Sequence, residues 1–324
     1  MAEWLVEEGI GEDRAIRLDG ATIVEARLDW PGALTAGQVE DAALISKSAG
    51  STRGTAKFAS GEEALVDNLP LDASEGSMLR LAVTRSAMRE RGRGKLAQSR
   101  PTDQPIRPAP ILAETLRGEG RDVRVVRRFP DCDWDELWNE AWSGEVAFSG
   151  GSLWFSDTPA MTLIDVDGDG DPTRLAKAAV PAIAAALRRF DLGGSIGIDF
   201  PTIQSKQERK QVDGLLAEAL ADWPHERTAI NGFGFAQIVA KLSREPVTRR
   251  LANCRVGAAA RRLLRQAECM DEAGVLQLTC HPALKTKLKQ RWLDDLARRT
   301  GRELRIEIDP SLALDGAFAQ AVSR

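Results

Sequence analysis

Apolar and polar residues alternate over short runs in the first part of the chain. Residues 15–30, "AIRLDGATIVEARLDW", alternate on both sides of an Asp-Gly pair at 19–20, a combination typical of a β-hairpin. Further short runs continue the alternation, at 54–60, 61–70 and 77–87. Short strands without a long helix predict a small β-barrel over residues 1–90.

Helix and strand patterns alternate in the rest of the chain. Residues 91–111 are rich in Gly, Pro and Arg and predict a linker. Residues 112–243 interleave helical periods with strand-like runs, which predicts a central mixed α/β domain. Residues 244–324 read helix, strand, helix and strand, which predicts a small C-terminal α/β domain. The predicted fold class is therefore α/β, in a multidomain α+β arrangement.

Two apolar strands in the central region end in the same way. "MTLIDVDG" (161–168) and "SIGIDFPT" (195–202) each place an aspartate directly after an isoleucine, at Asp165 and Asp199. The residues between them predict one long helix, and such a connection normally makes the two strands parallel. Neighbouring strands would bring both carboxylates to the sheet edge where α/β sites gather. Adjacent carboxylates repel each other unless a cation lies between them, so a metal site is one interpretation, and the other is that each aspartate caps a turn or a helix.

The stretch "LIDVDGDGDPTR" (163–174) has an aspartate at every second position and leaves three interpretations open. Counted from Asp165, it matches the first half of an EF-hand calcium loop, but Ala176 stands where the bidentate Glu belongs. A catalytic magnesium site would combine Asp165 with Asp199. The third interpretation is an ordinary acidic turn in which Asp171 caps the following helix.

The composition is that of a soluble globular protein, with 43% hydrophobic and 28% charged residues. The chain lacks a run of about 18 apolar residues, and its acidic start lacks the order of a signal peptide, so we expect a cytoplasmic protein without a membrane partner. Its four cysteines form no Cys-x-x-Cys pair and it has two histidines, which favours oxygen ligands over zinc. Net charge is −4, but residues 80–100 form a basic strip that can contact phosphates or be a solvated linker.

Three segments of the central region resemble one known family. "SGGSLWFSDTPAMTLIDVDG" (149–168) and "LRRFDLGGSIGIDF" (187–200) closely resemble the catalytic segment of the ribonuclease E/G family. "INGFGFAQI" (230–238) resembles the Ser-x-Phe-Gly-Leu segment that follows in that family. The similarity covers about residues 133–240. It implies an N-terminal OB-fold-like RNA-binding barrel, a central catalytic α/β domain and a small terminal α/β domain.

The resemblance also implies roles for individual residues. Asp165 and Asp199 match the two aspartates that hold the family's catalytic Mg2+, with Mn2+ as an alternative ion. Asp167 stands where the family has an asparagine, so this site is one carboxylate richer. RNA contacts are implied for an aromatic residue in the barrel, its basic turn and the segment after Gly234: Phe58, Arg89, Arg91, Lys95, Lys241 and Arg244.

The chain departs from the family at two places that concern its partners. Only the linker occupies the place of the family's 5′-end sensor, and the zinc-binding Cys-x-x-Cys link is absent, so neither zinc nor a zinc-linked dimer is expected. The implied function is a magnesium-dependent endoribonuclease that cleaves single-stranded RNA through a metal-activated water and leaves a 5′-phosphate and a 3′-hydroxyl. The alternative is a catalytically weak or inactive RNA-binding protein with the same fold, and a calcium-binding module is the third hypothesis.

Overall fold

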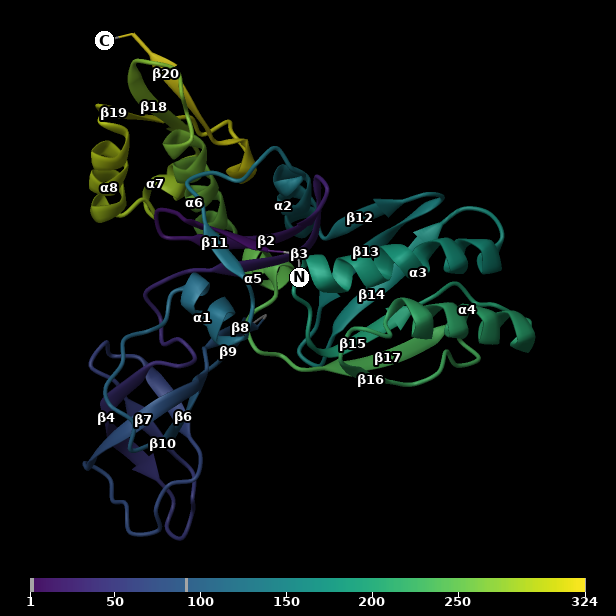
Figure 1. Cartoon of the computed structure of the whole chain (residues 1–324), viewed down its shortest axis with the longest axis horizontal. Coiled ribbons are helices and arrows are strands. Elements are labelled where there is room, and N and C mark those ends of the chain that lie inside the picture. The colour runs from purple at the N-terminus through teal and green to yellow at the C-terminus, as the bar shows by residue number, and fades with distance from the viewer. Residues whose placement is uncertain (1–2, 91–92, 324) are drawn as a thin grey trace.

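The chain folds into several α/β regions that surround a short N-terminal sheet. The computed structural model describes residues 3–90 and 93–323. Figure 1 shows a small barrel, a long central sheet with two helices along it, and a C-terminal α/β unit. This mixed α/β architecture is the one that the sequence predicts.

The first three strands form a sheet of their own. β1 (Trp4–Glu8), β2 (Asp13–Asp19) and β3 (Thr22–Asp29) make an antiparallel meander, and β11 (Val123–Val125) joins β1 in parallel. The hairpin predicted at the Asp-Gly pair is confirmed between β2 and β3. The prediction that residues 1–90 form one barrel is wrong for these strands, because β1 completes its hydrogen bonding with a distant segment.

The closed barrel contains five strands: β4 (Val39–Lys47), β5 (Gly54–Lys57), β6 (Glu63–Val66), β7 (Met78–Arg85) and β10 (Ala97–Pro101). β10 closes it by pairing in parallel with β6 and antiparallel with β7. The segment 91–111 is therefore more than the predicted linker. A composition rich in Gly, Pro and Arg conceals a strand there, because the strand is specified by its two partners rather than by its own propensity.

Shorter elements connect the barrel to the rest of the chain. A hairpin of β8 (Met88–Glu90) and β9 (Arg93–Lys95) leaves the barrel, and β8 lies against α5 (Val247–Asn253) (Figure 1). α1 (Leu112–Gly118) and α2 (Trp134–Ser143) then lead into the central sheet.

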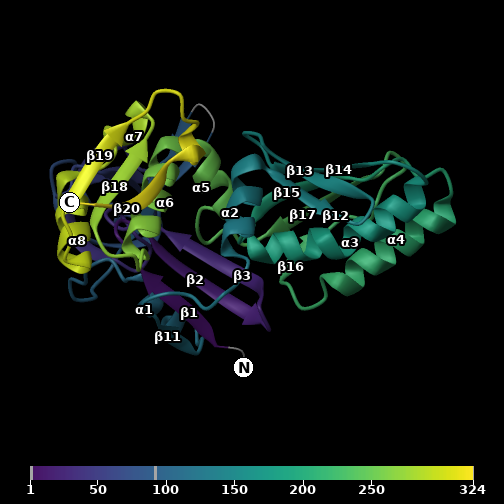
Figure 2. The same cartoon turned by 90° about the horizontal axis from the view of Figure 1, so that it is seen from above.

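The central sheet has six strands in the order β12-β13-β14-β15-β17-β16. Their bounds are β12 (Glu145–Phe148), β13 (Gly151–Asp157), β14 (Thr162–Gly168), β15 (Gly194–Asp199), β17 (Phe235–Ala240) and β16 (His225–Arg227). Neighbours are antiparallel except β14 and β15, which are parallel. α3 (Pro172–Arg189) joins those two strands, and it lies with α4 (Lys206–Ala219) on one side of the sheet in Figure 2.

The sequence of α3 explains both its start and its buried side. The Asp171 side chain accepts a hydrogen bond from the backbone N–H of Arg174 at 2.8 Å, so the predicted N-cap is confirmed. Pro181 lies inside the helix without ending it. Fully buried residues such as Ile183 and Leu187 pack on the sheet, and each contributes about 1.5–3 kcal/mol by leaving water.

The C-terminal region forms a small α/β unit around a three-stranded sheet. β19 pairs in parallel and β20 antiparallel with the central strand β18, and helices cover this three-stranded sheet. Its elements are α6 (Arg255–Glu268), β18 (Val275–Cys280), α7 (Pro282–Lys285), α8 (Gln290–Thr300), β19 (Leu304–Ile308), the 3-10 helix η1 (Leu314–Gly316) and β20 (Phe318–Val322).

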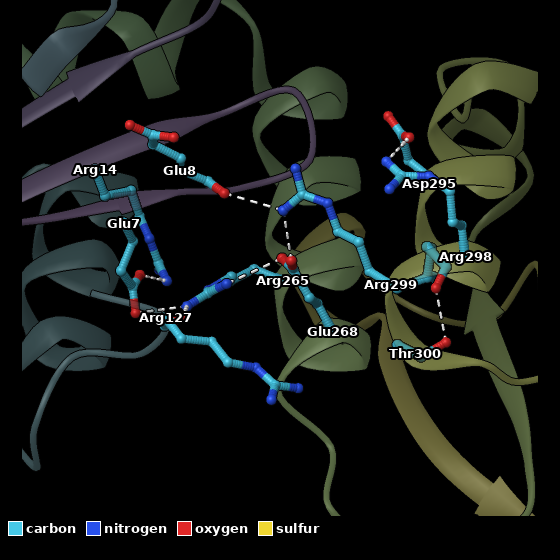
Figure 3. A network of polar contacts seen from close by, with 11 residues as sticks. Glu7, Glu8, Arg14, Arg127, Arg265, Glu268, Asp295, Arg298, Arg299 and Thr300 are labelled. Atoms are coloured by element: carbon cyan, nitrogen blue, oxygen red, sulfur yellow. Dashed lines mark hydrogen bonds and ion pairs between the residues drawn. The ribbon is translucent and has the colours of Figure 1, made fainter. Parts of the chain in front are cut away.

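An ionic network holds the C-terminal unit against the N-terminal sheet (Figure 3). Glu7 on β1 is 2% exposed, accepts a hydrogen bond from Arg14 of β2 and forms an ion pair with Arg265 of α6 at 2.6 Å. Glu268 joins Arg265 (2.9 Å) to Arg299 of α8 (2.7 Å). Removing one member would leave a buried charge unpaired, so the network fixes the two regions relative to each other.

Candidate active site

The two predicted carboxylates lie directly opposite each other on neighbouring parallel strands. β14 and β15 pair with Ile164 opposite Ile198 and Asp165 opposite Asp199. Both isoleucines are fully buried on the helix side, so the alternation of a strand turns the next residue to the other face. The prediction that Asp165 and Asp199 come out side by side is confirmed, and we call them the acid pair.

The acid pair lies at a step in the sheet. β15 ends at Asp199, whereas β14 continues to Gly168 because it still pairs with β13 there, opposite Gly151. Asp165 is therefore inside β14 rather than at its end, and the last residues of β14 have no partner on the β15 side. The carboxyl end of a parallel pair is where ligands bind in α/β sheets, and both aspartates are exposed there.

Negative charge accumulates around Asp165. Partial burial raises the pKa of its carboxyl above the ordinary value, and the charges of Asp199 and Asp167 raise it further. Asp167 is two positions along β14, so it is on the same face as Asp165. Its carboxylate accepts the Gly168 N–H at 2.9 Å. A divalent cation between the carboxylates would relieve this repulsion, so the donors fit Mg2+ or Mn2+.

The remaining aspartates of the acidic stretch do not complete a calcium cage. Asp171 caps α3, as described above, and Asp169 is exposed in the bend that precedes it. Across residues 3–90 and 93–323, the structure gathers no group of three or more His, Cys, Asp or Glu side chains able to hold a metal. A full EF-hand site needs six or more oxygens from one loop, so the geometry favours the acid pair over the calcium hypothesis.

The acid pair belongs to a row of four residues across the sheet. Trp154 of β13 lies opposite Asp165, and Phe235 of β17 lies opposite Asp199. Directly opposed residues in a sheet point to the same face, so an aromatic ring flanks each aspartate. Sequence reasoning missed both rings. The sequence did carry a signal: Trp154 follows Leu153 and Asp165 follows Ile164, so each points to the face opposite a buried side chain.

Two glycines permit close packing around Asp199. A Cβ on Gly197 would lie 2.6 Å from the Phe235 ring and 2.9 Å from the Met161 sulfur, so this ring occupies the space beside the acid pair. Gly234 has φ of +93°, and a Cβ there would lie 2.3 Å from the Phe200 carbonyl oxygen. The backbone that follows Asp199 is therefore pressed against the turn that begins β17.

The site lies on an open surface rather than in a cavity. Two cavities of the described residues, with volumes of about 570 and 520 Å3, are lined by other residues, one between α2 and α6 and the other around Asp191. A small substrate would normally bind in such a concavity. The open position of the acid pair instead suits a polymer that lies across the sheet.

The structure does not support Phe58 as a stacking residue. Its side chain is 3% exposed and belongs to the barrel core with Leu44 and Leu81, so it offers no face to a base. Lys95 on β9 is half-buried. Arg91 and the side chain of Arg89 lie outside the described residues.

Lys241 and Arg244 lie at the wrong end of the sheet to reach the acid pair. Because β15 and β17 are antiparallel, Ala240 pairs with Gly194, which is the first residue of β15, whereas Asp199 is the last. Lys241 follows there and is exposed. Arg244 forms ion pairs with Glu119 (2.7 Å) and Asp191 (3.2 Å). The antiparallel direction of β17 therefore places Lys241 away from the acid pair, and RNA contacts by Lys241 and Arg244 stay a prediction.

The region that contains the acid pair matches a known family. Residues 123–241 match the Ribonuclease E/G family. Over this region the chain is similar to the ribonuclease E/G family. The matched ribonuclease E/G region begins at β11, runs to the end of β17 and includes the whole row from Trp154 to Phe235.

Curated relatives align with part of the chain. Ribonuclease G of Salmonella typhimurium (strain SL1344) is 34% identical over 117 residues, which is 32% of this chain and 24% of that protein. Ribonuclease G of Escherichia coli (strain K12) and of Shigella flexneri are each 32% identical over 117 residues, with the same coverage. The chain thus spans about a quarter of the length of the curated relatives that it matches.

No helix among the described residues combines the length and the apolar character needed to cross a membrane.

Proposed function

We propose that this protein is a metal-dependent endoribonuclease that cuts single-stranded RNA at the acid pair. The observation that carries the proposal is the register of Asp165 against Asp199 within the ribonuclease E/G region. Two carboxylates leave most positions around a magnesium ion for water and substrate phosphate, which is how this ion is usually bound in phosphoryl chemistry.

The three aspartates on this face of the sheet would have different roles. Asp165 and Asp199 would hold Mg2+, or Mn2+ in its place, against the scissile phosphate. The bound ion would supply an activated water and stabilise the charge that develops on the phosphate. Asp167 adds a third negative charge on the same face, which strengthens attraction for a cation but disfavours a bare phosphate. The products would carry a 5′-phosphate and a 3′-hydroxyl.

The barrel supports an RNA substrate. It is closed, has five strands and contains one parallel pair made by a crossover, β6 with β10, which supports assignment as an OB-fold-like barrel. Its β8–β9 hairpin comes from the basic strip and lies against α5, between the barrel and the rest of the chain. Barrels of this kind bind single strands along a positively charged groove.

The test is cleavage of one unstructured, end-labelled RNA by the full chain in magnesium and in a chelator. We expect cleavage at internal positions in magnesium and none in the chelator, with products that a phosphatase-dependent ligation assay identifies as 5′-phosphorylated. The same site placed in the base-paired stem of a hairpin should be cut only when the hairpin is opened. Equal cleavage in the chelator would contradict the proposed metal dependence.

A second candidate is an RNA-binding protein that retains the fold without efficient cleavage. Asp167 favours this second candidate. It stands where the family has a neutral asparagine, and its charge raises the pKa of Asp165. Tight RNA binding by the parent, unchanged in Asp165→Asn and Asp199→Asn, with no cleavage in magnesium, would establish this candidate instead.

A further inference from the structure

Trp154 is exposed where a tryptophan is normally covered. The chain has eight tryptophans, all within the described residues, and the other seven are buried or half-buried, while Trp154 is 42% exposed. Large aromatic rings are among the side chains that gain most from leaving water. An uncovered ring on a strand is therefore available to a partner from outside the chain.

Phe233 is a second uncovered ring, on the other side of the acid pair. Its side chain is 84% exposed. The turn that carries it is fixed, because the Asn231 side-chain oxygen accepts the backbone N–H groups of Phe233 (2.8 Å) and Phe235 (3.1 Å). The N–H of Phe200, the residue after Asp199, donates to the Gly234 carbonyl at 3.1 Å. The backbone that carries Phe233 is thus held next to the residue that follows Asp199, so this part of the chain needs little ordering on binding.

The spacing of the strands relates both rings to the acid pair. Neighbouring strands are about 4.8 Å apart, so Trp154 is about 5 Å from the Asp165 position and about 10 Å from the Asp199 position along the row. A phosphate held between the carboxylates would have its 5′ and 3′ nucleotides within reach of a ring on each side. Trp154 is on the face that lacks α3 and α4, because the preceding Leu153 is buried on the helix side.

We propose that Trp154 and Phe233 stack on the unpaired bases that flank the phosphate held at the acid pair, and this inference rests on the proposed ribonuclease function. Every base has a flat face, so such stacking tolerates sequence and requires that the base be free of a duplex. The base-stacking surface is then part of the catalytic sheet, whereas the barrel phenylalanine is buried in its own core.

Binding measured apart from cleavage tests the rings. A labelled ten-nucleotide RNA without structure is titrated with the full chain in calcium, which takes the same oxygen ligands as magnesium, and a gel confirms that the RNA stays intact. Trp154→Ala and Phe233→Ala should each weaken binding about 5- to 100-fold, the range of one base stacked on one ring. Trp154→Phe should remain within about threefold of the parent, because a smaller ring still stacks.

A control variant removes an exposed apolar side chain from the other side of the sheet. Leu215 on α4 is 40% exposed, close to Trp154 in exposure. Leu215→Ala should bind RNA as the parent does. If Leu215→Ala weakens binding as much as Trp154→Ala, general surface hydrophobicity explains the effect and the proposal is overturned.

An RNA that lacks single bases probes the same contacts, first in the unaltered protein and then in the two alanine variants. An abasic nucleotide is moved through the ten positions. Two positions should weaken binding to the parent, one of them losing its effect in Trp154→Ala and the other in Phe233→Ala. Equal abasic penalties in the parent and both variants would overturn the stacking assignment.

The outcomes separate this inference from the proposed function. One outcome is that the parent protein binds with the expected abasic pattern but fails to cut RNA in magnesium. That result would support base stacking and contradict the proposed ribonuclease activity. If the parent protein cuts RNA and both alanine variants bind RNA normally, the proposed ribonuclease activity is supported and base stacking is contradicted. If the alanine variants instead change the oligomeric state in light scattering and leave RNA affinity unaltered, the rings contact a second copy and the proposal is overturned.

Discussion

The central sheet and the barrel are both built from short alternating strands, yet the sequence predicted which side chains are exposed correctly in one and not in the other. In the sheet, α3 covers one side of β14 and β15, so burial of Ile164 and Ile198 turns Asp165 and Asp199 outward. In the barrel no helix selects a face, and the side chain expected to meet RNA points inward. Alternation shows which residues share a face, but a covering element decides which face is exposed.

The barrel side of this comparison predicts the largest effect. Phe58→Ala removes a ring from the barrel core and should lower the free energy of unfolding by about 3–5 kcal/mol. Phe58→Leu keeps an apolar side chain there and should cost less than about 1.5 kcal/mol. Denaturant unfolding measures both. If Phe58→Ala keeps the parent's stability and loses only RNA affinity, Phe58 faces RNA after all and the contrast between the regions fails.

A glycine in the sheet predicts the next largest effect. Gly197→Ala places a Cβ against the Phe235 ring and the Met161 sulfur, and the resulting shift beside Asp199 should lower the cleavage rate about 100-fold. Gly214→Ala on α4 is the matched control, because nothing lies within 4 Å of its Cβ position. The control should stabilise the protein by about 0.5–1 kcal/mol and cleave normally. Parent-like cleavage by Gly197→Ala would show that the packing beside the acid pair is not critical.

The third charge on the sheet predicts a change in pH dependence. Asp167 helps to raise the pKa of Asp165, so Asp167→Asn should lower that pKa toward its ordinary value. An acid with a lowered pKa stays ionised, and able to hold a cation, to lower pH. The acid limb of the pH–rate profile should therefore move to lower pH, whereas Asp169→Asn, in the neighbouring bend, should leave the limb in place. A shift of the limb to higher pH in Asp167→Asn would contradict this charge arrangement.

The far end of the same sheet predicts the smallest effect. Lys241 is exposed next to the Ala240–Gly194 pair, at the opposite end of β15 from Asp199. Lys241→Ala should therefore change the cleavage rate by less than about twofold, the usual range for a surface substitution away from a site. A drop of tenfold or more would mean that RNA extends along the whole strand.

Local sequence patterns were sufficient to predict contacts between elements that are close in sequence. The Ile-Asp strands and the helix between them gave the parallel register, and Asp171 gave the helix cap, because these contacts depend on residues close in sequence. Strand membership could not be read where the partners are distant. β1 pairs with β11, and β10 closes the barrel from a segment that resembles a linker.

The aromatic rings of the site escaped sequence reasoning for a similar reason. Trp154 and Phe235 stand on strands that precede and follow the Ile-Asp pair, and only the pairing of β13 and β17 places them beside the acid pair. The distance of Lys241 from the acid pair could not be predicted either, because the antiparallel direction of β17 is a property of the sheet rather than of the motif.

The rate of RNA cleavage as a function of magnesium concentration tests the central claim most directly, with parent, Asp199→Asn and the control Asp169→Asn measured side by side. The account predicts that parent and Asp169→Asn rise to the same saturating rate. Asp199→Asn should fall at least about 100-fold below them, because a lost metal ligand removes several kcal/mol of transition-state stabilisation. Asp199→Asn that cleaves at the parent's rate at every magnesium concentration would show that the acid pair is not the site of the reaction.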